Sequence, residues 1–93
     1  MTDEIVELVL YVTGDSGRAR RAIDSLQSLC DRQLPAGSHF RVVDVVAEPE
    51  LARKARILAT PTLQKLSPGP PRRIVGDIAS MDGVLSALDL EPK

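Results

Sequence analysis

The sequence has one cysteine, two aromatic residues and no tryptophan in 93 residues. A single cysteine, Cys30, excludes an internal disulfide and any chemistry that needs two thiols in one chain. The scarcity of aromatic side chains, Tyr11 and Phe40, argues against a binder of single-stranded nucleic acid, which stacks bases on such rings. The chain also lacks the run of about 18 apolar residues that a membrane span requires. We therefore expect neither nucleic acid nor a membrane as partner.

Neither sign of charge dominates the chain. Lysine and arginine number 12 and the acidic residues 13, giving a net charge of −1, without the positive field of a general nucleic-acid binder. The beginning, "MTDEIVEL", is acidic where a secretory signal is basic, so we expect a cytoplasmic protein. The length suffices for one hydrophobic core but not for separate cofactor and substrate domains, which predicts a single domain over residues 1–93.

The first half of the chain has the pattern of a β-α-β unit. Residues 5–12 are apolar with one charged interruption, which is typical of a strand buried on both faces. Over residues 18–34 the apolar positions recur three and four apart, which predicts an amphipathic helix capped by Asp15 or Ser16. Residues 40–46 predict a second strand, parallel to the first.

The second half predicts two shorter strands between two helices. Residues 49–58 begin with a proline at a position that a first helical turn tolerates, and residues 62–66 and 72–77 flank a proline-rich turn. Residues 80–88 predict a last helix, with a serine at its start. The expected fold is therefore α/β, in the thioredoxin-like order βαβαββα.

The segment "ILATPTLQKL" places Pro61 where the second helix passes into the third strand. Proline lacks the amide N–H and disfavours helical geometry in the residue before it, so it ends the helix. In thioredoxin-like domains a proline directly before the third strand usually takes the cis form, and we expect the same of Pro61.

The residues predict no catalytic, cofactor or metal site. A thioredoxin-like enzyme carries its reactive cysteines between the first strand and first helix, where this chain reads Thr13-Gly14-Asp15-Ser16-Gly17. Cys30 falls on the apolar stripe of the helix, which favours a buried structural thiol. His39 is the only histidine and has no neighbouring ligand residues, and no spacing rule pairs Asp44 with Asp77.

Positive charge gathers in three places along the chain, at residues 18–21, 53–56 and 65–73. In a thioredoxin-like arrangement the ends of these segments can converge into a basic surface that faces an acidic partner protein.

Five segments, "LYVTGDSG", "VVDVVAEPELA", "ILATPTLQKL", "PPRRIVGD" and "VLSALDL", resemble the KaiB circadian clock family in order and spacing along nearly the whole chain. The resemblance implies a small non-enzymatic protein, without a cofactor, that binds the ring-shaped ATPase KaiC and can then sequester the activator KaiA. The partner-facing basic positions of the family match Arg21, Arg56, Lys65, Arg72 and Arg73 of this chain.

The resemblance further implies a metamorphic protein with two folds. A tetramer-forming ground state ordered βαββααβ exchanges with a thioredoxin-like state, and the latter binds the ATPase. Pro61, Pro70, Pro71 and Ala87 are the positions that we expect to set the balance. Ala87 occupies a slot where many members carry glycine, a poorer helix former, so we expect the free chain to be mainly thioredoxin-like and monomeric, with a tetramer in the alternative fold.

Two alternatives stay open at this stage. Asp15-Ser16-Gly17-Arg18 replaces the usual Asn-Thr-Pro-Asn loop of the family, and Arg53-Lys54-Ala55-Arg56 replaces an acidic stretch. A divergent paralogue, or a fixed-fold sensor or adaptor domain related to that of the clock histidine kinase, therefore also fits. The other class is a thiol-disulfide enzyme, which the accessibility of Cys30 to a thiol reagent would distinguish from a binding module.

Overall fold

The computed structural model describes residues 4–76, 81–88 and 90. Its elements follow the predicted order βαβαββα. They are β1 (Glu7–Val12), α1 (Gly17–Gln33), β2 (His39–Asp44), α2 (Pro49–Lys54), β3 (Thr62–Ser67), β4 (Arg72–Val75) and α3 (Met81–Ala87). The thioredoxin-like order expected from the sequence is therefore confirmed.

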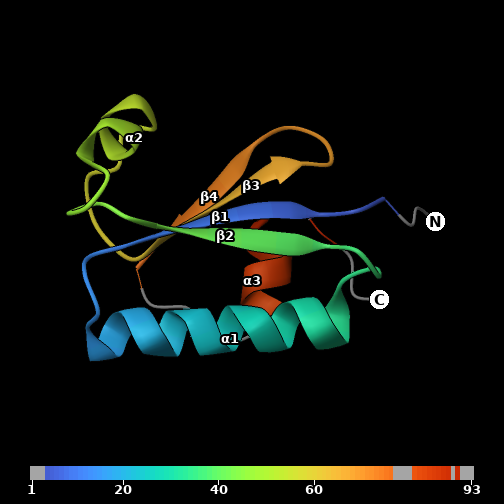
Figure 1. The fold of residues 1–93 in the computed structure, drawn as a ribbon. Helices are drawn as coiled ribbons and strands as arrows, with labels where there is room; N and C mark the ends of the chain where they lie inside the picture. The colour runs from blue at the N-terminus through green and yellow to red at the C-terminus, as the bar shows by residue number, and fades with distance from the viewer. Residues whose placement is uncertain (1–3, 77–80, 89, 91–93) are drawn as a thin grey trace.

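The strands form one sheet in the order β2-β1-β3-β4. β1 pairs with β2 in parallel and with β3 antiparallel, and β4 continues the sheet antiparallel to β3. Figure 1 shows α1 and α3 on one face of the sheet and α2 at one end of the opposite face. β1 is covered on both faces, which explains why its sequence is almost wholly apolar.

The main core lies between the sheet and the two helices α1 and α3. Alternate residues of β1 face it, because successive side chains of a strand point to opposite faces. Its buried members are Val6, Leu8, Leu10, Val12, Ala19, Ala22, Leu26, Leu29, Leu34, Leu63, Val84, Leu85 and Leu88. A smaller cluster of Val9, Tyr11 and Val43 lies on the opposite face, with Val45, Ala55 and Ile57 packed against it.

α1 begins and ends where the sequence predicts a boundary. The Ser16 side chain caps it by accepting a hydrogen bond from the Ala19 backbone N–H at 3.1 Å. The helix stops at Gln33, since Leu34 adopts an extended conformation before Pro35. Ser16, rather than Asp15, is therefore the N-cap.

α2 is shorter than predicted, because it ends at Lys54 rather than at residue 58. Arg56 has a left-handed backbone, φ 56°, and turns the chain out of the helix. The Arg56 N–H bonds to the Arg53 carbonyl at 3.1 Å and the Ile57 N–H to the Ala52 carbonyl at 3.0 Å. This pair of bonds is a Schellman motif, which satisfies carbonyls at a helix end and usually has glycine where this chain has Arg56.

The bounds of β2 and α3 and two cis peptide bonds also bear on the sequence predictions. β2 ends at Asp44, two residues early, and α3 falls within the predicted helix, whose proposed first residue, Ser80, lies outside the described residues. The Thr60–Pro61 peptide bond is cis, as expected. The Ser67–Pro68 bond is also cis, which the sequence did not indicate.

Candidate partner-binding surface

The turn between β1 and α1, where thioredoxin-like enzymes carry their cysteines, holds hydroxyl and carboxylate groups. The Thr13 and Thr60 hydroxyls are hydrogen-bonded at 2.6 Å, which joins this turn to the segment before Pro61. A cavity of about 160 Å³ lies here, lined by Val12, Thr13, Ser16, Arg18, Ala19, Thr60 and Pro61. Arg20 donates to both carboxylate oxygens of Asp15, at 2.9 and 2.8 Å. The groups at this turn are thus bonded to one another, and none of them is a thiol.

Cys30 lies in the second half of α1, far along the helix from this turn. Its side chain is partly buried against the main core. Burial, and secondarily the neighbouring carboxylate of Asp31, raises the pKa of the Cys30 thiol to about 11. The thiol is therefore protonated at neutral pH, whereas nucleophilic and metal-binding cysteines act as thiolates.

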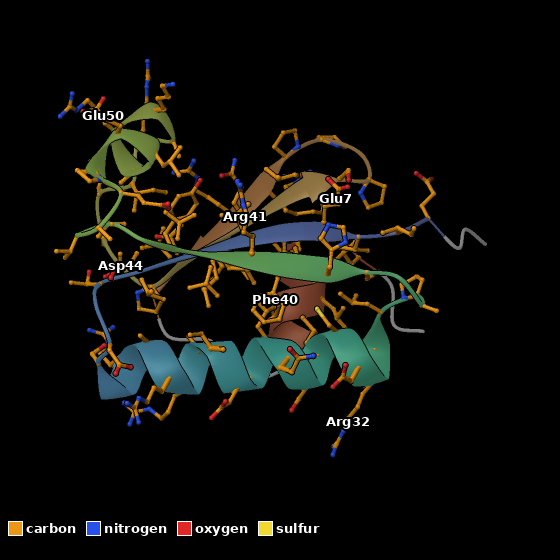
Figure 2. All side chains as sticks on the ribbon, viewed as in Figure 1. Glu7, Arg32, Phe40, Arg41, Asp44 and Glu50 are labelled. Atoms are coloured by element: carbon orange, nitrogen blue, oxygen red, sulfur yellow. The ribbon has the colours of Figure 1, made fainter. Side chains whose placement is uncertain are left out.

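Asp44 holds two turns at the same end of the sheet. Its carboxylate accepts hydrogen bonds from the backbone N–H of Gly14 at 3.0 Å and of Val46 at 2.9 Å. These bonds, the Gly14 bond foremost, lower the pKa of Asp44 below its ordinary value. Figure 2 shows Asp44 at the end of β2, beside the turn that leads into α1. Its carboxylate is occupied by the backbone, so its role in this structure is structural.

α2 presents leucine and basic side chains to solvent. None of its six residues is buried, and Leu58, just beyond it, is 97% exposed. We call the large apolar and the basic residues that are exposed in and next to this helix the α2 surface: Val46, Leu51, Arg53, Lys54, Arg56 and Leu58. Arg53 pairs with Glu50 at 3.0 Å. The exposed carboxylates of Glu48 and Glu50 thus lie in the same segment as the three basic residues of the α2 surface.

The end of α2 is attached to β4 by Arg73. The guanidinium donates one hydrogen bond to the Ala55 carbonyl at 2.8 Å and another to the Arg56 carbonyl at 3.3 Å. A cation at a helix C-terminus also offsets the partial negative charge there. Arg73 is exposed, but its guanidinium is engaged within the molecule.

The five basic residues that the sequence analysis assigned to partner contact do not share one surface. The structure brings Arg56 and Arg73 together, as described above. Arg72 directly precedes Arg73 on β4, and its side chain points to the opposite face because successive strand residues alternate. Arg21 is exposed on α1, across the sheet from α2 (Figure 1).

Lys65 lies in the core and not on the surface. It is 2% exposed and pairs with Leu8 of β1, so its side chain is on the face covered by α1 and α3. A Cβ added at Gly69 would be 3.9 Å from the Lys65 Nζ, which places the amine next to the β3–β4 turn. In this conformation Lys65 offers no surface to a partner. The sequence holds a signal for this position: Lys65 comes two residues after the core residue Leu63, and residues two apart on a strand share a face.

The four positions expected to set the fold balance lie in different places. Pro61 is buried before β3, and Pro70 and Pro71 are exposed between β3 and β4. Ala87 is exposed and is the last residue of α3. Sequence reasoning missed the exposed leucines of the α2 surface, because it placed Leu58 inside a longer helix.

The part of the chain that the structure describes shows neither a group of metal ligands nor a membrane-spanning helix. Within residues 4–76, 81–88 and 90, no three His, Cys, Asp or Glu side chains are grouped as metal ligands would be. No helix in these ranges has the length and apolar character needed to cross a bilayer.

Comparison with known sequences places these features in a family context. A family model described as the KaiB domain matches residues 9–90. The circadian clock oscillator protein KaiB of Prochlorococcus marinus (strain MIT 9312) is 41% identical over 83 residues, covering 89% of this chain and 79% of that protein. The protein of the same name from Thermosynechococcus vestitus is 41% identical over 83 residues, covering 89% and 77%.

Solved structures share the fold at lower sequence identity. The N-terminal domain of Synechococcus elongatus SasA superposes with a TM-score of 0.63 and 22% identity, covering 92% of this chain and 81% of that one. Thioredoxin O2 from Arabidopsis thaliana gives a TM-score of 0.70 at 18% identity, covering 91% and 73%. These likenesses establish a thioredoxin-like fold.

Proposed function

Because the chain belongs to the KaiB family of circadian clock proteins, we propose that it is a non-enzymatic protein that binds a KaiC-type ATPase ring. Once bound, it sequesters a KaiA-type activator. The thioredoxin-like state described above is the binding state, and it acts as a monomer. The raised pKa of Cys30 and the lack of a second cysteine support a binding role rather than thiol chemistry.

The α2 surface carries this proposal. Leu58 is 97% exposed, so nearly all of its apolar surface is in contact with water. Complete burial of such a side chain at an interface lowers the free energy by about 1.5–3 kcal/mol. The three basic residues of this surface outnumber the exposed Glu48 and Glu50 beside them. This excess of positive charge favours an acidic patch on the partner, which steers association and sets the orientation. Arg56 is the member of the sequence-predicted contacts that belongs to this surface.

Titration of a KaiC-type ATPase ring with the purified protein tests the proposal. We expect Leu58→Ser to weaken binding by about tenfold, as loss of a central apolar anchor does. Arg53→Glu with Lys54→Glu should weaken binding and reduce its salt dependence. Arg32→Glu, at the far end of α1 (Figure 2), is the matched charge-reversal control and should bind like the wild type.

Two results would contradict this assignment. Equal binding by the Leu58 and Arg53/Lys54 variants, with unchanged circular dichroism, would remove the α2 surface from the interface. Failure of the wild-type protein to bind any KaiC-type ring would overturn the function itself. Addition of a KaiA-type activator to the preformed complex then tests sequestration, which predicts a larger complex on size-exclusion chromatography.

A further inference from the structure

Few contacts hold α2 against the rest of the protein, so its position depends on the contacts at its C-terminal end. The helix buries no residue, so little apolar area fixes its position. Beyond its last turn, Ala55 and Ile57 pack against the small cluster of Val9, Tyr11 and Val43. Among the described residues, Arg73 is the one whose side chain donates hydrogen bonds to the backbone of this end.

The backbone at this end is also in an unfavourable conformation. Arg56 occupies the left-handed position of the Schellman motif, with φ 56°, where glycine is normally found because a Cβ is poorly tolerated. The hydrogen bonds from Arg73 to the carbonyls of Ala55 and Arg56 bind the two residues that make this turn. They therefore stabilise a conformation that the local sequence disfavours.

We propose that Arg73 is a positioning residue, which fixes the end of α2 and thereby the α2 surface, and that it does not itself contact the partner. The inference rests on the proposed function insofar as that surface is the docking site. The planar guanidinium can reach two neighbouring carbonyls at once, whereas a lysine ammonium at this position is a single point charge on a flexible stem. Arginine is thus required for geometry as well as for charge.

Hydrogen exchange of the free protein tests the positioning role. The reporters are the amides of Arg56 and Ile57, which make the Schellman bonds. Arg73→Ala should speed their exchange by about tenfold, as the loss of charge-assisted hydrogen bonds does, and Arg73→Lys should give an intermediate rate. Arg72→Ala is the matched control, because Arg72 is exposed on the same strand but points to the opposite face; exchange of the two amides should be unchanged in it.

A double-mutant cycle with Arg56→Gly separates positioning from direct contact. Glycine tolerates the left-handed backbone, so the end of α2 depends less on Arg73 in that background. We expect Arg73→Ala to weaken binding to the KaiC-type ring several-fold in the wild type and much less in Arg56→Gly. A direct contact of Arg73 with the ring would be lost equally in both backgrounds, and that result would overturn the proposal.

Hydrogen exchange tests the positioning role of Arg73, and ring binding tests the proposed function. Unchanged exchange at Arg56 and Ile57 in Arg73→Ala would refute the positioning role whether or not the ring binds. Absence of ring binding by the wild-type protein, together with faster exchange in the Arg73 variant, would instead refute the function and leave Arg73 as the residue that fixes α2.

Discussion

Lys65 is a charged residue at a position where apolar residues are usual, on the core face of the sheet. The residue is 2% exposed and its stem lies on the core face of β3, with the amine next to the β3–β4 turn. No buried side-chain nitrogen or oxygen of the described residues lacks a hydrogen-bond partner, so the amine is not an unsatisfied buried group. A side chain of similar length without the amine would be wholly apolar at this position and would gain more from the same burial.

Lys65→Met should therefore raise the free energy of unfolding by about 1 kcal/mol, because methionine buries more apolar surface there, and urea denaturation measures the difference. Methionine is unbranched and adapts to the space left by the lysine stem. Lys54→Met, at an exposed position of α2, is the control and should change stability by less than about 0.5 kcal/mol. A clear loss of stability in Lys65→Met would mean that the amine stabilises this state.

Cys30 provides a second prediction at this scale, since its pKa is raised to about 11. Only the thiolate reacts with iodoacetamide, so the rate of alkylation should still be rising at pH 10. The double variant Cys30→Ala with Ser86→Cys moves the thiol to an exposed position on α3, and its rate should level off at lower pH. Rapid alkylation of wild-type Cys30 at pH 7 would contradict the burial described here and reopen the enzymatic alternative.

Among the helices and strands, the sequence predicted the features that follow from residue periodicity. It missed the features that are set by contacts between residues far apart in the chain. The β-α-β unit and a helix cap at Asp15 or Ser16 follow from local patterns, and the structure assigns the cap to Ser16. The early end of α2 does not follow from such patterns, because arginine at position 56 gives no sign of a left-handed turn. The bond from Arg73 to Ala55 joins residues 18 positions apart. For the same reason the predicted basic surface gathered residues that the fold separates.

Arg56→Gly should stabilise the protein by about 1 kcal/mol, because glycine removes the steric penalty at φ 56°. Arg53→Gly is the matched control. It lies within α2, where glycine costs about 1 kcal/mol relative to a good helix former, so it should destabilise. Thermal unfolding of both variants measures the difference, and a loss of stability in Arg56→Gly would show that the arginine side chain outweighs its backbone strain.

Asp44 connects the turn after β1 to the turn after β2, and this connection depends on pH. Its pKa is lowered in the folded protein from an ordinary value of 3.8. The stabilising effect is therefore fully present above that ordinary value and is lost as the pH falls through the lower folded pKa. Urea midpoints of the wild type should decrease in acid more steeply than those of Asp44→Asn, which keeps an acceptor oxygen but does not titrate. Parallel pH profiles would contradict this role.

For the whole molecule, the balance between two folds remains a prediction, and α3 is the element that tests it. Ala87→Gly should weaken the helix by up to about 1 kcal/mol and shift the population toward the alternative order βαββααβ. Backbone NMR of residues 84–88 distinguishes helix from strand. Ala36→Gly, in the exposed turn before β2, is the control and should leave the spectrum of α3 unchanged. A strand through these residues in the wild-type protein would show that Ala87 does not decide the balance.

The central place of β1 has a consequence for self-association. Both edges of this strand are hydrogen-bonded, one to β2 and the other to β3. A rearrangement that withdrew β3 would leave an unpaired edge between two apolar faces, and such an edge recruits a strand from another chain. Sedimentation over a range of concentrations should therefore show that any refolded population grows as the protein is concentrated, whereas dilution returns β3 to the vacant edge.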